Sequence, residues 1–204
     1  MPRQERTGSV NGTVPNRRKN DRLRGGRKHL TESEIEKLMA TARKFGRYGH
    51  RDATAILITY AHGLRVSELA KLQWTQIDFR RGTIQVGRLK GGTPSTHFLS
   101  GRELRALRQL RRENVQSRYL FVGERGELSA AWFRKMFARI GERAKMPFPV
   151  HPHMLRHACG FKLANAGKDT RSLQGYLGHR DIRSTAVYAE LVPDRFSGWQ
   201  SEFD

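Results

Sequence analysis

The sequence predicts a mainly α-helical domain with one small antiparallel β-sheet, an α+β fold in which helices dominate. Three observations lead to this prediction. Apolar residues recur at helical spacing through most of the chain after Leu30. Two of these periodic segments begin at a Ser or Thr that is followed three residues later by Glu, a pattern typical of helix starts. Only between residues 83 and 99 does the pattern change to one typical of strands.

The composition favours a polyanionic partner. Across 204 residues, 39 Lys and Arg stand against 19 Asp and Glu, a formal net charge of +20. Such a field attracts nucleic acid or an anionic membrane surface. The membrane alternative loses most of its support, because the sequence has neither a long apolar run nor an apolar stretch after its start, MPRQERTGSV. The single cysteine, Cys159, suits a reducing compartment. We expect a cytoplasmic protein that associates with the nucleoid when it binds DNA.

Residues 1–28 are predicted to form a basic arm that is disordered in the free protein, and residues 29–204 to form the folded domain. The arm is rich in Arg and Lys and nearly lacks large apolar side chains. It therefore buries too little surface to offset chain entropy. We expect the arm to lie along DNA phosphates, with contacts from Arg17, Arg18 and Lys19. The alternative is a solvated tail.

The first three helices have clear boundaries in the sequence. In LTESEIEKLMATARKFG (30–46), Thr31 and Glu34 form a capping box, and apolar residues follow at helical spacing up to a Gly that can end the helix. An apolar helix is predicted through ATAILITYAH (53–62), ending at Gly63. A short third helix follows in VSELAKL (66–72).

A β-hairpin is predicted next. The segments TIQVGRL (83–89) and STHFL (95–99) read as two strands, and Gly91 and Gly92 supply the turn between them.

Helices are predicted for most of the remaining chain. Ser100 and Glu103 form a second capping box before a leucine-rich helix, and Ser129 is a candidate N-cap for the next helix. Three short helical patterns complete the chain: about 153–166, about 171–178, and one from about 182 that contains Tyr188.

The stretch HPHMLRHACG (151–160) allows two kinds of site. His153 and His157 would share one helix face, which is a candidate zinc pair. However, the stretch has no HExxH pattern and no acidic residue, and Arg156 would place a positive charge beside the ion. The second kind is a phosphate site. Arg156 offers a planar fork of donors that matches two phosphate oxygens, and His153 could exchange a proton near neutral pH.

Two other stretches offer partners for a phosphate site. In AHGLRVSELAKL, Arg65 begins a short helix, and Glu68 lies one turn later, where it can orient the guanidinium. In YLGHRDIRSTAVYAEL, His179 follows a glycine and Tyr188 comes nine residues later. Each residue alone has an ordinary explanation, such as a surface ion pair or a core aromatic.

In this order, GLRVSEL, a hairpin lysine, HMLRH, LGH and a Tyr nine residues later resemble the tyrosine recombinase (phage integrase) family. The resemblance covers about residues 30–196. Within the family, the short chain and the stretch PHMLRHACG look most like the recombinases that invert promoter segments in fimbrial phase variation.

The resemblance implies roles for individual residues. Arg65 and Arg156 would bind the non-bridging oxygens of the scissile phosphate, and Tyr188 would be the nucleophile. Lys90, in the hairpin, would protonate the leaving 5′ oxygen. His153 would assist proton removal.

The resemblance also implies supporting roles. His179 would hydrogen-bond the phosphate, and Glu68 and His157 would hold the site together. Arg88 lies close to Lys90, and we expect it to contact DNA.

Two arginines can stabilise the charge that builds up on the phosphate, so no metal or other cofactor is expected. The resemblance implies strand exchange through a 3′-phosphotyrosine, without ATP, on double-stranded DNA and with four protomers on paired sites. Relatives have a further helical domain before the catalytic one; here an accessory DNA-bending protein or the basic arm is expected to substitute. The final VPDRFSGWQSEFD would dock on a neighbouring subunit or pack on its own domain.

Three alternatives remain from the residues alone. They are a topoisomerase-like enzyme that rejoins the original ends, a DNA-binding regulator that has lost cleavage, and a zinc hydrolase that uses the 151–159 cluster.

Overall fold

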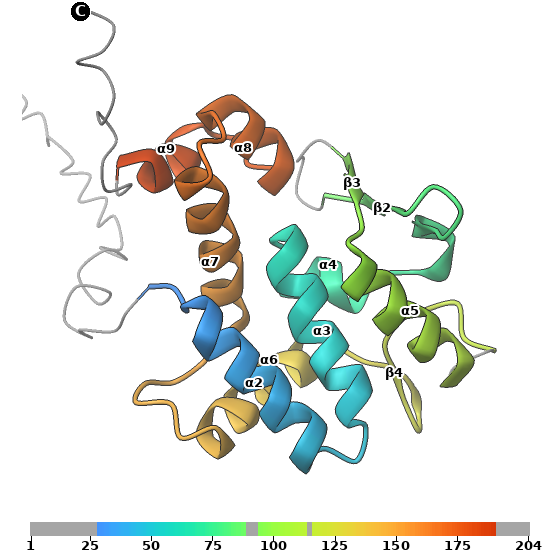
Figure 1. Cartoon of the computed structure of the whole chain (residues 1–204). Helices are drawn as coiled ribbons and strands as arrows, with labels where there is room; N and C mark the ends of the chain where they lie inside the picture. Colours follow the sequence, from blue (N-terminus) through green and yellow to red (C-terminus); the bar gives the residue numbers. More distant parts are fainter. Residues whose placement is uncertain (1–27, 89–93, 114–115, 191–204) are drawn as a thin grey trace, which may run out of the picture.

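The structure, a computed structural model, describes residues 28–88, 94–113 and 116–190 (Figure 1). Four residues with predicted roles, Arg17, Arg18, Lys19 and Lys90, lie outside the described residues, as does the terminal VPDRFSGWQSEFD. The described chain is mainly helical with small antiparallel sheets, which confirms the predicted fold class.

Helices α2 (Glu32–Phe45) and α3 (Gly49–His62) pack side by side (Figure 1). The predicted capping box is present: the Thr31 hydroxyl accepts a hydrogen bond from the Glu34 backbone N–H at 3.3 Å, and the Thr31 N–H donates to the Glu34 carboxylate at 2.8 Å. Helix α3 begins earlier than predicted. Its polar first turn is buried because Arg51 and Asp52 form an ion pair at 2.7 Å.

A three-stranded antiparallel sheet follows the short helix α4 (Val66–Ala70) and the 3₁₀ turn η1 (Trp74–Gln76). Its strands are β1 (Ile77–Asp78), β2 (Thr83–Val86) and β3 (Ser95–Phe98), in the order β1-β2-β3. Val86 pairs with Ser95, as expected for a hairpin, whereas β1 was not predicted. The His97 ring stacks at 3.8 Å on Tyr176, which joins the sheet to the C-terminal part of the domain.

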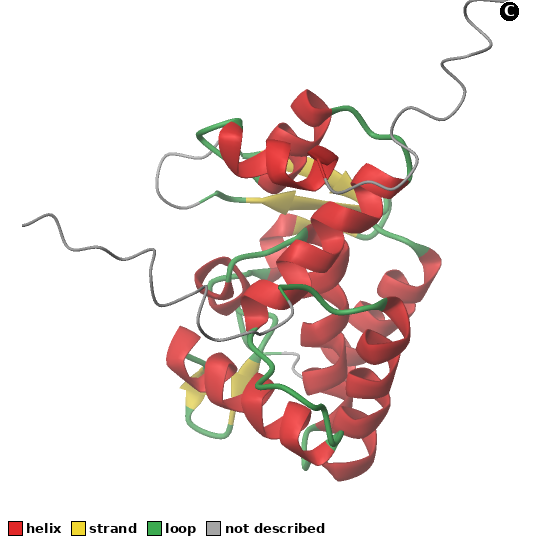
Figure 2. Cartoon of the chain, turned by 90° about the vertical axis from the view of Figure 1, so that its left-hand side faces the viewer, coloured by secondary structure: helices red, strands yellow, loops and turns green. Residues whose placement is uncertain are grey.

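Helices α5 (Gly101–Glu113) and α6 (Ala130–Arg143) have the predicted caps. The Ser100 N–H donates to Glu103 at 2.9 Å, and the Ser129 hydroxyl accepts from the Trp132 N–H at 3.1 Å. Between them, β4 (Val122–Gly123) and β5 (Gly126–Glu127) form a two-stranded ribbon that was not predicted. The two small sheets are separate: in Figure 2 one lies in the upper part of the view and the other at the lower left.

Helix α7 (Pro152–Asn165) packs against α3, and α8 (Thr170–Leu177) and α9 (Arg183–Glu190) gather at its C-terminal end (Figure 1). A large apolar core joins α2 to α7, and a smaller cluster between α7, α8 and α9 includes Phe161 and Tyr188. This arrangement places the end of α8, the start of α4 and the middle of α7 next to one another. In the described ranges, no helix has the length and apolar character to cross a membrane.

Candidate active site

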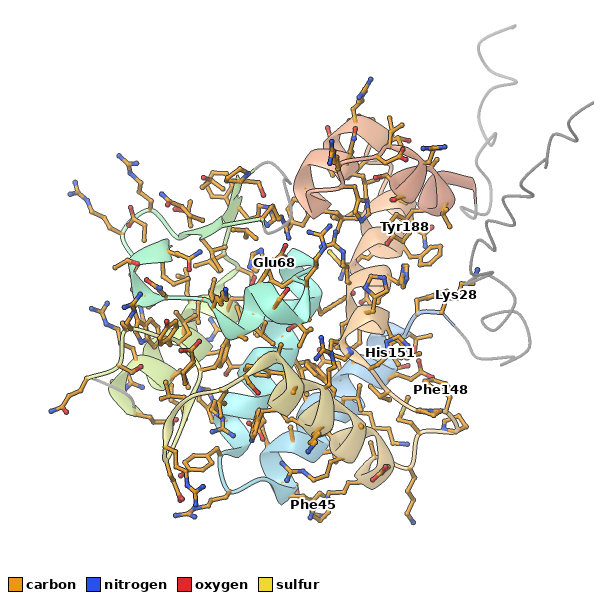
Figure 3. The ribbon with its side chains drawn as sticks, turned by 180° about the vertical axis from the view of Figure 1, so that it is seen from behind. Lys28, Phe45, Glu68, Phe148, His151 and Tyr188 are labelled. Atoms are coloured by element: carbon orange, nitrogen blue, oxygen red, sulfur yellow. The ribbon has the colours of Figure 1, made fainter. Side chains whose placement is uncertain are left out.

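Arg65 is held at the start of α4 by the residue one turn later. Its backbone N–H donates to Glu68 Oε2 at 2.9 Å and its Nη1 to Glu68 Oε1 at 2.8 Å. Nη2 reaches the carbonyl of Gly178, just after α8, at 3.3 Å. The side chain of Arg65 keeps 29% of its surface exposed, whereas that of Glu68 keeps 2%. The buried carboxylate of Glu68, labelled in Figure 3, therefore fixes the Arg65 guanidinium. Solvent, or an anion from solvent, can still reach that guanidinium.

Arg156 enters the same place from α7. It is 1% exposed, and its two terminal nitrogens donate to backbone carbonyls, Nη1 to Gly63 and Nη2 to Leu177 at 2.6 Å. Burial, followed by the positive charges of Arg65 and Arg88, lowers the pKa of Arg156 to about 10. The guanidinium therefore stays charged near neutral pH, and an anion that approached it would stabilise this charge.

Positive charge exceeds negative charge at this point. Arg65 and Arg88 both pair with the same carboxylate, that of Glu68, and the hydrogen bonds of Arg156 go to uncharged carbonyls. Two guanidinium groups thus share one carboxylate, and the third, that of Arg156, has no carboxylate as a hydrogen-bond partner among the contacts given above. Partly desolvated cations in excess favour an anionic ligand such as phosphate.

The two histidines of α7 lie one turn apart. The rings of His153 and His157 meet edge to face with centroids 4.4 Å apart. Partial burial, and then the charge of Arg156, lowers the pKa of His153. Burial and the charges around it lower the pKa of His157 to about 4. His157 is therefore neutral near pH 7 and can accept a proton.

Tyr188 is buried behind these histidines. It is 2% exposed, and its hydroxyl lies 2.9 Å from His157 Nδ1. Its ring packs edge to face on Phe161 and covers Gly160, where a Cβ atom would lie only 2.6 Å from the tyrosine Cζ. Burial raises the pKa of Tyr188 to about 12, although Arg156 acts in the opposite direction. The hydroxyl is thus protonated and enclosed, within the electrostatic reach of Arg156 (Figure 3 labels Tyr188).

Sequence reasoning missed two supports of this tyrosine. Gly160 is the glycine of HPHMLRHACG, and the close contact with Tyr188 explains why the stretch ends in a residue without a side chain. Thr185 is buried, and its hydroxyl lies 2.8 Å from His179 Nδ1. The His179 ring lies parallel to that of Tyr188 at 6.3 Å. Thr185 lies one turn before Tyr188 in a predicted helix, a spacing that could have indicated it.

The structure corrects one expectation, the DNA contact of Arg88. Its side chain is 0% exposed. Its Nη1 pairs with Glu68 at 3.0 Å, and its Nη2 donates to the carbonyls of His62 and Tyr176. Because Arg88 alternates in phase with the buried Ile84 and Val86, it faces the interior rather than a phosphate.

The described residues contain no complete ligand set for the alternative zinc site. Over residues 28–88, 94–113 and 116–190, no three His, Cys, Asp or Glu side chains are grouped so that they could hold a metal ion. The other predicted residues of the site, except Lys90, come together at the ends of α3 and α8, the start of α4, the middle of α7 and α9.

Comparisons with known proteins give the family of the chain and agree with its fold. The model of the phage integrase family matches residues 28–195. Type 1 fimbriae regulatory protein FimB of Escherichia coli (strain K12) is 39% identical over 178 residues, which cover 84% of this chain and 88% of that protein. Tyrosine recombinase XerC of Oceanobacillus iheyensis is 33% identical, over 81% of this chain and 57% of that protein.

Solved structures show the same fold. XerA recombinase superposes with a TM-score of 0.72 at 24% identity, over 86% of this chain and 64% of that one. The XerH site-specific recombinase bound to its difH substrate superposes with a TM-score of 0.73 at 23% identity, over 87% of this chain and 55% of that one. The chain thus spans about three fifths of the length of these structures. On these matches in sequence, the chain belongs to the phage integrase family of tyrosine recombinases.

Proposed function

We propose that this chain cleaves and rejoins double-stranded DNA site-specifically through a covalent 3′-phosphotyrosyl bond at Tyr188. The observation that carries the proposal is the convergence of Arg65 and Arg156 on the carbonyls that end α8, next to the buried pair formed by Tyr188 and His157. Family membership supports the reaction class.

The arginines supply the charge that the reaction needs. When an oxygen attacks a phosphodiester, negative charge grows on the non-bridging oxygens. Arg65, whose side chain is accessible, and Arg156, which is short of counter-charge, are suited to stabilise it. Both are held before substrate arrives, because each is bonded to backbone carbonyls that fix its position.

The tyrosine supplies the attacking oxygen. The Tyr188 oxygen forms a bond to phosphorus while the bond to the 5′ oxygen breaks. Its proton must be removed. The hydroxyl lies 2.9 Å from Nδ1 of His157, and His153, which the family pattern assigns to proton removal, lies one turn away. Because the hydroxyl is enclosed, α9 must shift when DNA is bound so that Tyr188 reaches the phosphate.

The remaining roles come from the family pattern. Lys90 would donate the proton to the departing 5′ oxygen, and His179 would hydrogen-bond the phosphate. The phosphotyrosyl bond conserves the energy of the broken linkage, so a new 5′ hydroxyl reverses the step without ATP.

Partners follow from the relatives. XerH is solved bound to its difH substrate, and a λ integrase dimer is solved bound to a core site. We propose that this chain binds paired DNA sites as a tetramer, aided by an accessory DNA-bending protein, and is nucleoid-associated there. We propose inversion of a DNA segment, because the sequence resembles the recombinases of fimbrial phase variation and one relative is named a fimbriae regulatory protein.

A plasmid assay tests this function. Fragments of the DNA that flanks the gene are placed as two inverted copies on a plasmid, and junctions between them are amplified after incubation with the protein. We expect inverted segments with the wild type and none with Tyr188→Phe. Relaxed plasmid without any recombinant junction would instead indicate a topoisomerase-like enzyme.

The proposed role of the arm has its own test. Deletion of residues 1–28, the basic segment defined above, should weaken DNA binding and flatten its salt dependence, because the slope is about −0.9 per phosphate neutralised. Replacing Arg17, Arg18 and Lys19 with Gln is the milder comparison. An unchanged slope in both variants would show that the arm is a solvated tail.

A further inference from the structure

Arg88 is an arginine that the reaction described above does not use. It follows β2 by two residues, and its side chain has no exposed surface. Burial lowers its pKa, while the nearby carboxylate of Glu68 opposes that shift. An ion buried this deeply is costly unless its partners compensate for the lost water, so its partners indicate its role.

One of those partners, Glu68, is also the partner of Arg65. Glu68 Oε2 accepts from Arg88 Nη1 at 3.0 Å and from the Arg65 backbone N–H at 2.9 Å, while Oε1 accepts from Arg65 Nη1 at 2.8 Å. Arg88 thus restrains one oxygen of the carboxylate whose other oxygen aims the Arg65 guanidinium. Without Arg88, Glu68 could rotate and take the guanidinium with it.

The C-terminal end of α8 is a second structure that Arg88 shares with Arg65, and Arg156 binds there as well. Three successive carbonyls each accept from a different arginine: that of Tyr176 from Arg88, that of Leu177 from Arg156, and that of Gly178 from Arg65. The C-terminal end of a helix has partial negative charge, which favours cations there. Arg88 is therefore bonded to both structures that hold the phosphate arginines.

The backbone of Gly178 packs closely against the side chain of Arg88. It adopts φ +63, and a Cβ atom there would lie 2.6 Å from both Cγ and Cδ of Arg88. The stem of Arg88 thus acts as a support for the turn that presents the Gly178 carbonyl and the next residue, His179.

We propose that Arg88 is a positioning residue for Arg65: it fixes Glu68 and the end of α8 so that the Arg65 guanidinium meets the scissile phosphate. This inference rests on the proposed function, because it assigns Arg88 to the same site. The competing explanation is that Arg88 is only a stabilising buried ion pair, like Arg51 with Asp52, which is buried far from this site.

The experiment compares two DNA substrates of one sequence. One has the natural phosphodiester at the cleavage point, and the other has a methylphosphonate, in which a methyl group replaces one non-bridging oxygen and removes the charge. A neutral linkage needs less help from arginine in the transition state. Rates of covalent adduct formation are measured under single turnover for the wild type, Arg65→Ala, Arg88→Gln and the control Arg51→Gln.

We expect Arg88→Gln to slow cleavage of the phosphodiester about 100-fold, the cost of a misplacement of about 1 Å. On the methylphosphonate, the deficit relative to the wild type should shrink in Arg88→Gln as it does in Arg65→Ala. DNA affinity should change little. Combining Arg65→Ala with Arg88→Gln should be no worse than Arg65→Ala alone, because the two act through one group.

Equal deficits on both substrates, or additive effects in the double variant, would overturn the proposal and leave Arg88 a stabilising residue. Arg51→Gln should show any loss equally on both substrates. If Arg88→Gln does not fold, Arg88→Lys decides the matter: it keeps the charge but not the fork, and it should show the same shrinking deficit. If the wild type itself forms no adduct on the phosphodiester, the proposed function fails rather than the role of Arg88.

Discussion

The two halves of the candidate site are built differently. The arginine half, Arg65 and Arg156, is fixed by hydrogen bonds to a buried carboxylate and to backbone carbonyls at the C-terminal ends of α3 and α8. The tyrosine half depends on one hydrogen bond to His157 and on ring packing over Gly160 and Phe161. The first half is ready to bind an anion, whereas the second encloses its reactive group. In the proposed reaction, the arginines would bind phosphate without moving far, and attack would wait for a rearrangement of α9.

The largest effect should come from removing only the attacking oxygen. In Tyr188→Phe, the ring still packs on Phe161 and Gly160, and only the hydrogen bond to His157 is lost, which costs on the order of 1 kcal/mol. Covalent adduct should be abolished while DNA affinity stays within a few-fold of the wild type, as measured by gel electrophoresis and fluorescence anisotropy. Residual adduct would identify another nucleophile.

Damage to the arginine half should be next in size. Arg156→Ala removes a charge beside the phosphate and leaves the carbonyls of Gly63 and Leu177 without their donor. We expect single-turnover cleavage to fall on the order of 1,000-fold, and the free energy of unfolding to fall by about 1–3 kcal/mol for each carbonyl left unpaired. Cleavage and DNA affinity that fell in parallel would make Arg156 a docking residue instead.

Lowering the pH should reduce the free energy of unfolding, in part through the histidines around Tyr188. His157 and His179 have pKa values of about 4 in the folded protein, below the value of about 6.5 expected when unfolded. Below pH 6.5 the unfolded chain binds protons that the folded one does not, so stability is lost as pH falls from about 6.5 to about 4. Since both rings are partly exposed, we expect a discounted loss on the order of 2 kcal/mol, or roughly 4–8 °C in Tm.

Thermal melts between pH 7 and pH 4.5 check this effect. His179→Asn removes one of these titrating rings and should flatten part of the decline, while His97, whose pKa burial lowers to about 3, still contributes to the rest. An undiminished decline in that variant would place the responsible groups elsewhere.

The smallest effect tests the packing under Tyr188. In Gly160→Ala the new methyl group would lie 2.6 Å from the tyrosine ring, so the ring must move, at a cost of about 1–3 kcal/mol. Gly175→Ala is the matched control: it also lies within a helix, but its Cβ would meet nothing within 4 Å. Tm should fall in the first variant and rise slightly in the second, because Ala favours helix by about 1 kcal/mol over Gly. Equal changes would mean that Tyr188 does not rest on Gly160.

Local chemistry made much of the fold predictable. The caps at Thr31, Ser100 and Ser129 and the strands on either side of the hairpin turn follow from neighbouring residues alone. The strands β1, β4 and β5 were missed because two residues are too few to show an alternating pattern. The early start of α3 was missed because the ion pair of Arg51 with Asp52 compensates for burying a polar turn.

The candidate site, like the fold, was only partly predictable from the sequence. The convergence of Arg65, Arg156 and Tyr188 was predicted from family resemblance, since no spacing reveals contacts between residues more than 90 positions apart. The burial of Arg88 was available in the sequence, because it shares strand phase with Ile84 and Val86, but its charge favoured a DNA contact. Its partners Glu68 and Tyr176 come from distant segments, so only the structure could identify them.

The most direct measurement maps the covalent bond itself. Nicked duplexes that cover the flanking DNA are incubated with the protein in EDTA, and the adduct is digested and sequenced by mass spectrometry. We expect a nucleotide joined through its 3′ phosphate to Tyr188, formed without any divalent metal. An adduct on another residue, or cleavage that strictly requires metal, would contradict the assignment of the phosphate to Arg65 and Arg156 and of the attack to Tyr188.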